Sequence, residues 1–353
     1  MRPLGAWAWT RVAVALLALL NLHRDGGFLA GWDSWDATLF AKVAEFGYDG
    51  YPQHYPDAGV EAFFPGFPLV LRAVHVVVPS WALAGLLVSA VALAVAVVWL
   101  ARLAVLEGAD GTAAVLLLLL SPYAVFLAAP YSEALFLALA VPGWWAARQG
   151  RWATASVLVA GACAVRVSGL FLAVALVVQW LVASRSWRSL PWLALPFGVL
   201  AAFSAYLHHL TGDWLRWLHA QESGWGRRLS WPWDAFQRSW DNAWHIALPT
   251  EYVWSARAEL LAVAVGVLAT GFLLRRRLWG EAVYVGLSVA ALATSTSYLS
   301  VARATLLWFP LWVLLAGWLD RRWERRWVPA YVAVSGPLMA VNVLTFTSGR
   351  WVG

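Results

Sequence analysis

Two aspartates stand three residues apart in the sequence WDSWDATLF at 32–40. If this stretch is helical, Asp33 and Asp36 lie on one face, beside tryptophan rings. A carboxylate held against apolar rings can have a raised proton affinity and serve as a general base. Two alternatives stay open. One aspartate only caps a helix over 37–46, since aspartate is favoured at helix starts, or the pair binds a hard divalent cation through its oxygens.

The segment around these aspartates is acidic in a chain that is otherwise basic. Between residues 24 and 63 there are seven carboxylates against one arginine and one lysine, whereas the whole chain carries a net charge of +6. A concentration of acid at one place indicates a function there. Two carboxylates without further fixed ligands are a weak metal signal, so a divalent cation is compatible with the pair but we do not expect an obligatory one.

A second group of polar residues interrupts apolar runs elsewhere in the chain. It consists of Tyr131, Ser132 and Glu133 in one short stretch, and of Arg166 and Arg303. Ionisable residues at membrane depth are candidates for function. The planar guanidinium of arginine matches the oxygens of a phosphate, which suits a lipid-linked phosphate. The alternative is that both arginines reach lipid headgroups or pair with Glu133.

Long apolar runs must position these residues. Of 353 residues 62% are hydrophobic and only 12% are charged, with a mean hydropathy of +0.66, which excludes a soluble domain. The chain is predicted to be an all-α polytopic membrane protein with about eleven transmembrane helices. They are expected at about 9–23, 81–104, 112–129, 131–147, 152–165, 168–184, 190–210, 257–274, 281–297, 303–319 and 328–345.

Arginines between the apolar runs predict the orientation. With a cytoplasmic N-terminus they fall in the inner connections, as the positive-inside bias requires. They are Arg102, Arg148, Arg151, Arg185, Arg188, Arg275–Arg277, Arg321, Arg322, Arg325 and Arg326. The outer side then receives the long loops 24–63 and 211–256. Residues 63–79 hold three prolines, so we expect an interfacial or re-entrant segment there rather than a span.

Several functional classes are disfavoured. The basic residues are spread over short loops and form no single patch, which argues against a nucleic-acid partner. The only cysteine, Cys163, permits no intrachain disulfide and no thiol metal cluster.

The apolar run at 12–22 is expected to be a retained span, since no small-residue cleavage site follows. Loop 211–256 is rich in tryptophan, which is typical of an interfacial belt or of rings that stack on sugars.

Three blocks resemble the PIG-V family of glycosylphosphatidylinositol mannosyltransferases and its bacterial relatives, which have the GT-C glycosyltransferase fold. The first is WDATLFAKVAEFGY at 35–48 with EAFFPGFPLVLR at 61–72, and the second is SPYAVFLAAPYSEALFLALA at 121–140. A weaker third block joins RVSGLF at 166–171 to SYLSVARATLLWFPLW at 297–312. The likeness covers the first half of the chain well and the second half more loosely.

This resemblance implies transfer of mannose from a polyprenyl-phosphate donor to an acceptor hydroxyl on the outer face, with Asp36 as the base. Our own hypothesis adds that the reaction inverts the configuration, that the acceptor is a lipid or a glycan, and that Arg303, with Arg166, binds the donor phosphate. Substrate contacts are expected from Tyr131, Ser132, Glu133, Asp33 and His54. The preference for arginine over lysine suggests a bacterial plasma membrane.

The fold expected from the resemblance is a single GT-C-like transmembrane domain over 1–353, with a catalytic outer loop at about 24–80, a second at 211–256 and helices in the outer loops. No cofactor is expected to be obligatory. Two other classes stay open, a transporter or flippase of a lipid-linked sugar and a non-catalytic membrane scaffold. Transporters often show repeated halves with broken helices, a pattern that we do not find in this sequence.

Overall fold

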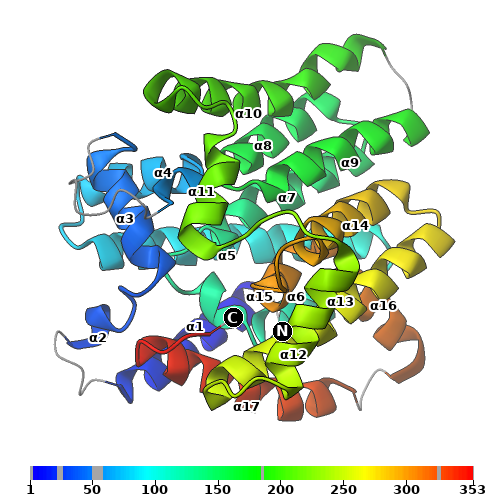
Figure 1. Ribbon diagram of the computed structural model, residues 1–353. Coiled ribbons are helices and arrows are strands. Elements are labelled where there is room, and N and C mark those ends of the chain that lie inside the picture. Colours follow the sequence, from blue (N-terminus) through cyan, green and yellow to red (C-terminus); the bar gives the residue numbers. More distant parts are fainter. Residues whose placement is uncertain (1–2, 22–26, 50–58, 184–186, 324–326, 353) are drawn as a thin grey trace. The chain divides into compact units, whose positions relative to one another are not determined.

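The computed structural model describes residues 3–21, 27–49, 59–183, 187–323 and 327–352 (Figure 1). Within these ranges the regular elements are helices, and the one β-bridge joins Leu229 to Ser295. The α-helices are α1 (Pro3–Leu19), α2 (Gly27–Ala30), α3 (Asp36–Phe46), α4 (Gly66–His75), α5 (Trp81–Leu106), α6 (Gly111–Leu119), α7 (Glu133–Arg148), α8 (Trp152–Val165), α9 (Ser168–Ala183), α10 (Leu190–Thr211), α11 (Arg216–Trp225), α12 (Pro232–Trp244), α13 (Thr250–Arg275), α14 (Trp279–Ala293), α15 (Val301–Ala304), α16 (Phe309–Trp323) and α17 (Trp327–Thr347). Short 3₁₀ helices are η1 (Val60–Ala62), η2 (Ala124–Leu127), η3 (Trp187–Ser189) and η4 (Thr305–Leu307).

Four helical segments in the described part of the chain are long and apolar enough to cross a bilayer. They are Trp81–Leu106, Trp187–Thr211, Thr250–Arg275 and Pro329–Thr347, and a bent pair, Val301–Leu307 with Phe309–Leu319, makes a fifth if it is one span. Four shorter apolar helices, α1, α8, α9 and α14, accompany them. A polytopic, all-helical membrane protein is therefore supported, while the number of eleven spans stays a prediction.

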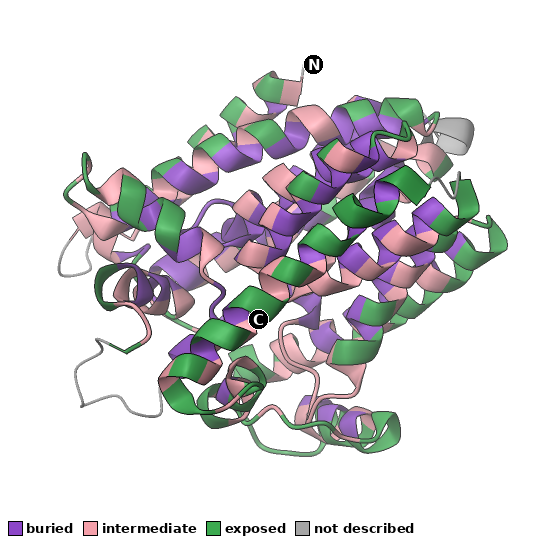
Figure 2. Cartoon of the chain, turned by 90° about the horizontal axis from the view of Figure 1, so that it is seen from above, coloured by how far each residue is buried: buried purple, intermediate pink, exposed green. Residues whose placement is uncertain are grey.

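The long helices are apolar on their exposed faces as well as on their buried ones. In α5, Val91 is 65% exposed, and in α13 Leu261 and Leu268 are 66% and 73% exposed. Figure 2 shows buried and exposed residues side by side along the same helices. A helix that is hydrophobic all round has nothing to gain from water on its outer face, so these faces suit lipid chains.

Two predicted spans are interrupted for reasons visible in the chain. The helix predicted over 112–129 ends at Leu119, because Pro122 cannot continue it, and the 3₁₀ helix η2 follows. The helix predicted over 303–319 is divided into α15, η4 and α16, and α16 begins beside Pro310, which is tolerated in a first helical turn. Residues 63–79 form only the ten-residue α4, consistent with a segment that does not span.

The chain forms two compact units. The first contains residues 1–38, 70–145 and 306–352. In it α1 packs against α5, α6 and α17, and α16 packs against α5 and α6. At the end of α1, the Asn21 side-chain amide donates to the Leu344 carbonyl (2.8 Å) and to the Thr347 hydroxyl (2.7 Å), which ties the first helix to the last.

The second unit contains residues 39–69 and 146–305. In it α8 packs against α9 and α10, α14 packs against α9 and α13, and α12 lies on α13 (Figure 1). The turn from α8 to α9 is tight, since a Cβ on Gly169 would lie 2.4 Å from the Cα of Cys163. Cys163 itself is fully buried there. The single domain predicted over 1–353 stays a prediction.

Candidate functional site

Asp36 is the first residue of α3 and lies on a strained turn. The residue before it, Trp35, has φ 58, a left-handed conformation that costs an ordinary side chain roughly 1–2 kcal/mol. Asp36 is half-buried. Asp33 lies in an exposed bend ahead of the helix, so the two carboxylates do not share a helical face as a helix over both would have required.

The hydroxyl of Tyr131 fixes the backbone of this turn. The backbone N–H of Asp36 donates to the Tyr131 hydroxyl oxygen (3.2 Å), and that hydroxyl donates to the Ser34 carbonyl (3.3 Å). Tyr131 is 1% exposed, so neither bond competes with bulk water. The structure thus joins the two blocks at 35–48 and 121–140 through one buried side chain, which orients Asp36 at its backbone.

An aromatic cluster in the first unit supports this tyrosine. The ring of Phe346 in α17 meets Tyr131 and Phe126 edge to face, both at 5.7 Å between centroids, and Trp32 at 6.0 Å. Trp32 is almost fully buried, so the first tryptophan of the motif anchors the turn. The second, Trp35, is 39% exposed and rests against the ring of Trp351.

The stretch Tyr131–Glu133 is set by a close approach of α5. The Ser89 hydroxyl donates to the Ala129 carbonyl (2.7 Å), and a Cβ on Gly85 would lie 2.4 Å from the Cβ of Pro130. Small residues at both positions of α5 therefore allow the turn to lie against the helix. Glu133, which begins α7, is fully buried, as is Ser132 beside it.

Arg303 lies on the four-residue helix α15, which a buried carboxylate from α13 holds in place. Glu259 accepts hydrogen bonds from the backbone N–H groups of Ser300 (2.9 Å), Val301 (2.5 Å) and Ala302 (3.0 Å). Ser300 has φ 60, so α15 too is entered through a left-handed residue other than glycine. Arg303 is 7% exposed.

Side chains from the loop 211–256 hold the segment before α15. Arg227 donates to the Leu299 carbonyl (3.0 Å), and Arg238 donates through Nε to the Thr296 carbonyl (2.6 Å). The hydroxyl of Ser239 accepts from the backbone N–H of Tyr298 (2.7 Å). Polar residues of this loop therefore brace the segment that leads to Arg303, a role that its tryptophan-rich composition did not indicate.

The tryptophans of the same loop form a ladder along α12. Consecutive ring centroids are 5.6 Å apart for Trp233 and Phe236, 5.7 Å for Phe236 and Trp240, and 4.3 Å for Trp240 and Trp244. The guanidinium of Arg257 in α13 lies 5.5 Å from the ring centroid of Trp244. The three tryptophans are exposed, so the ladder is open to lipid or to a sugar, and both interpretations of these rings stay predictions.

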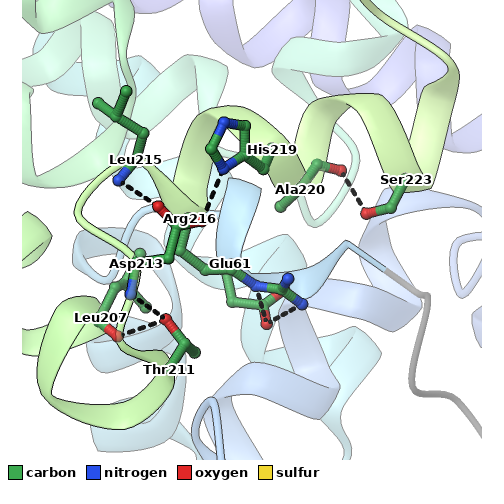
Figure 3. Close-up of polar contacts among 9 residues, drawn as sticks. All are labelled: Glu61, Leu207, Thr211, Asp213, Leu215, Arg216, His219, Ala220 and Ser223. Carbon is green, nitrogen blue, oxygen red and sulfur yellow. Dashed lines mark hydrogen bonds and ion pairs between the residues drawn. The ribbon is translucent and has the colours of Figure 1, made fainter.

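The Phe-Phe-Pro segment at 61–72 is held against α11 by an ion pair between Glu61 and Arg216, called the clasp below. Arg216 donates through Nε and Nη2 to the same oxygen of Glu61, at 2.9 Å each, as Figure 3 shows. Gly59, just before this segment, has φ 64, and a Cβ there would lie 2.6 Å from the Ala220 carbonyl oxygen. Phe64 packs in a small core with Phe203. The glycine and the ion pair together bring the segment onto the loop helix.

Polar groups next to the clasp are engaged within the protein. Asp213 pairs with His219 (2.6 Å) and accepts from the Leu215 N–H (2.9 Å), contacts that hold the pKa of its carboxyl below the usual range, with the bond to His219 the main cause (Figure 3). Tyr48 donates to the Phe63 carbonyl (2.5 Å), and burial, with smaller contributions from Tyr206 and Glu61, raises its pKa. The His219 ring is thus engaged with the Asp213 carboxylate.

The predicted site residues belong to both units. The first unit contains Asp33, Asp36, Tyr131, Ser132 and Glu133, and in it Asp36 and Tyr131 are in contact. The second unit contains Arg166 and Arg303.

Arg166 caps α8 in an extended conformation, and His54 lies outside the described residues. Among the described residues there is no group of three or more His, Cys, Asp or Glu that could hold a metal ion.

Comparisons with known proteins point to one family. Residues 21–194, which include Asp36, Tyr131 and Arg166, match the family described as Mannosyltransferase (PIG-V). The chain is 38% identical over 158 residues to the mouse (Mus musculus) GPI alpha-1,6-mannosyltransferase 2 and 37% identical over 157 residues to the human (Homo sapiens) protein of that name. Each alignment covers 41% of this chain and 30% of the relative, so the chain matches under a third of its curated relatives' length. The resemblance predicted from the blocks within these residues is confirmed, whereas the part at 297–312 lies outside the match and stays a prediction.

Proposed function

We propose that this chain, whose residues 21–194 match the PIG-V mannosyltransferase family, is an integral membrane enzyme of GT-C type. It transfers mannose from a polyprenyl-phosphate donor to a hydroxyl of a lipid or glycan acceptor. The observation that carries the proposal is the contact between Asp36 and Tyr131 inside the matched region. It gives a carboxylate with a fixed backbone at the start of a helix.

The reaction needs one base and one group that stabilises a leaving phosphate. The acceptor oxygen attacks the anomeric carbon while the bond from that carbon to the phosphate oxygen breaks, and its electron pair stays on the phosphate. Attack from the opposite face inverts the configuration. Asp36 takes the proton of the acceptor hydroxyl, and Arg303, with Arg166, neutralises the phosphate charge, which is the larger catalytic contribution.

Other candidate residues have supporting roles in this proposal. Ser132, Glu133, Asp33 and His54 orient sugar hydroxyls, while the hydroxyl of Tyr131 is engaged with the turn of Asp36 and so positions the base as well. The apolar faces of the helices offer a path for the polyprenyl chain. The active site then faces the non-cytoplasmic side of a bacterial plasma membrane.

The first test is replacement of the base. Asp36→Asn keeps the shape of the side chain but cannot accept the proton, so mannose transfer should fall by roughly 10²–10⁴-fold. Transfer is measured with protein in nanodiscs, radiolabelled polyprenyl-phosphate mannose and membrane lipid extracts. Asp49→Asn is the matched control, because Asp49 is an exposed carboxylate just after the same helix.

The outcomes separate three functions. Full activity of a folded Asp36→Asn protein would exclude this residue as the base. Movement of the donor across the bilayer without a new glycosidic bond would favour a flippase, and indifference to every change in residues 24–63 would favour a scaffold.

A second prediction concerns metal. We expect no obligatory divalent cation, because an inverting transfer from a lipid phosphate is supplied with charge neutralisation by Arg303 and Arg166. Transfer should therefore persist in excess EDTA after dialysis against metal-free buffer. Loss of activity on chelation, with recovery on adding Mg²⁺ or Mn²⁺, would contradict this expectation and would direct attention to Asp33 and Asp36 as ligands.

A further inference from the structure

We propose that Glu259 is a positioning residue that holds Arg303 in place for the donor phosphate. This inference rests on the proposed function, since it concerns the geometry of a residue assigned to the donor. Glu259 lies in a helix that is apolar enough to span the membrane, and it is 1% exposed. A buried carboxylate in such a helix is costly unless hydrogen bonds and charge offset its desolvation.

Three successive backbone N–H groups offset that cost. Ser300 is left-handed and the residues after it are helical, so their N–H groups converge on one point. Such a concave set of N–H groups binds anions. Here the anion is the Glu259 carboxylate, which accepts from Ser300 through Oε1 and from Val301 and Ala302 through Oε2. Because these N–H groups are already engaged, contact with a phosphate falls to side chains of the segment.

The hydrogen bonds from Ser300, Val301 and Ala302 to Glu259 form a clamp, and it ends one residue before Arg303. A helix of four residues has no stability of its own, because the first turn is a costly nucleus. The conformation of α15 is therefore imposed from outside, and Glu259 contributes the three bonds nearest to Arg303. Arg227 adds a bond to the Leu299 carbonyl on the other side of the left-handed Ser300. The backbone that carries Arg303 is thus fixed by charged side chains of two other elements.

Loss of the clamp should act on catalysis through Arg303. Glu259→Gln has nearly the same shape, but it replaces one acceptor oxygen with an NH₂ group that faces backbone N–H donors. The segment 300–302 must then shift or open. A misplacement of about 1 Å in a positioning element can lower a rate by roughly 10²-fold, so we expect the kcat/KM for the donor to fall by about 10- to 100-fold. The KM for the acceptor should change little.

A double-mutant cycle tests whether the effect passes through Arg303. If it does, Glu259→Gln should lower kcat/KM strongly in the natural protein but hardly at all in an Arg303→Ala background. Full additivity of the two changes would overturn the proposal, and so would an unchanged kcat/KM in a folded Glu259→Gln protein. Glu281→Gln is the matched control, because Glu281 is another buried carboxylate of the second unit, paired with Arg148. It should alter thermal stability without altering donor KM.

Two further measurements keep the test decisive. Hydrogen exchange at the amides of Ser300, Val301 and Ala302 should accelerate in Glu259→Gln, whatever the reaction is. Unchanged exchange would refute the clamp itself. Faster exchange in Glu259→Gln, together with unchanged donor binding in Arg303→Ala, would refute the proposed role of Arg303 in donor binding. If Glu259→Gln does not fold, Ser239→Ala loosens the same segment by one bond. Like Glu259→Gln, it should lower the kcat/KM for the donor, here through a higher donor KM. An unchanged donor KM counts against the proposal.

Discussion

The turn before Asp36 and the turn before Arg303 solve the same problem by different means. Each presents a charged residue at or near the start of a helix that is entered through a left-handed residue other than glycine, Trp35 in one case and Ser300 in the other. The first is held by one neutral hydroxyl and by aromatic packing. The second is held by a buried carboxylate and by side chains of the loop 211–256. Similar strain is thus balanced by packing in one unit and by charge in the other.

The two turns should therefore respond differently when the side chain that holds each of them is removed. A neutral hydrogen bond contributes about 0.5–1.5 kcal/mol, whereas bonds to a charged group contribute roughly 1.5–3 kcal/mol each. Loss of Tyr131 should therefore loosen the Asp36 turn only in part, because the rings of Trp32 and Phe346 still pack. Loss of Glu259 should release the segment before Arg303 more completely.

Among the substitutions at the two turns themselves, Tyr131→Phe should have a larger effect than glycine at either left-handed position. This change keeps the ring but removes both hydrogen bonds of the hydroxyl, so the backbone of Asp36 is held by packing alone. One bond of this kind corresponds to about 1.4 kcal/mol, and kcat should fall roughly tenfold. The decrease should be clearly smaller than that of Asp36→Asn. Steady-state kinetics with the donor at saturation measures it.

Tyr252→Phe serves as the control for Tyr131→Phe, because Tyr252 is 41% exposed at the start of α13. A loss of activity as large as that of Asp36→Asn would contradict the view that Tyr131 only holds the turn, since it would mean that its hydroxyl contacts the reacting groups. No change in kcat would mean that packing alone sets the turn.

The smaller effect is expected from glycine at the two left-handed positions. Ser300→Gly relieves strain of roughly 1–2 kcal/mol and leaves the bonds to Glu259 intact, so the thermal midpoint should stay or rise slightly. Trp35→Gly relieves similar strain but loses the contact with Trp351, an aromatic pair that contributes about 0.5–1.5 kcal/mol beyond its buried area. Its midpoint should stay or fall.

Thermal unfolding in one detergent, with both glycine variants side by side, checks this sign difference. A lower midpoint for Ser300→Gly than for Trp35→Gly would contradict the view that charge holds one turn and packing holds the other. Ser300→Val is the complementary control, because a β-branched residue is disfavoured at a positive φ and should lower the midpoint.

Local patterns were sufficient to predict much of the helical architecture. Apolar runs of membrane length predicted most of the helices, because bilayer thickness fixes that length, and the start of α3 fell within one residue of its predicted place. The blocks at 35–48 and 121–140 contain both Asp36 and Tyr131. Their contact joins positions 95 apart in the chain, so only the family resemblance suggested that they share a site.

The remainder depends on contacts between distant residues, which a pattern along the chain does not contain. Glu259 stands at the start of an apolar run, and its three partners begin 41 positions later. Nothing nearby marks it as more than one acidic residue at the end of a span. Asp33 was expected on the face of Asp36 because a spacing of three suits a helix, yet the left-handed Trp35 begins the helix between them.

The solitary sulfhydryl of Cys163 has a practical consequence for mapping the membrane sidedness of this protein. It lies fully buried in α8, against the start of α9, so reagents that attack thiols from water have no native target on the folded chain. A cysteine introduced at an exposed site such as Asp33 would consequently report its own compartment without background from the parent molecule. Selective labelling with an impermeant maleimide, applied to intact cells and to inverted vesicles, would then show on which side of the bilayer the WDSWDA turn lies.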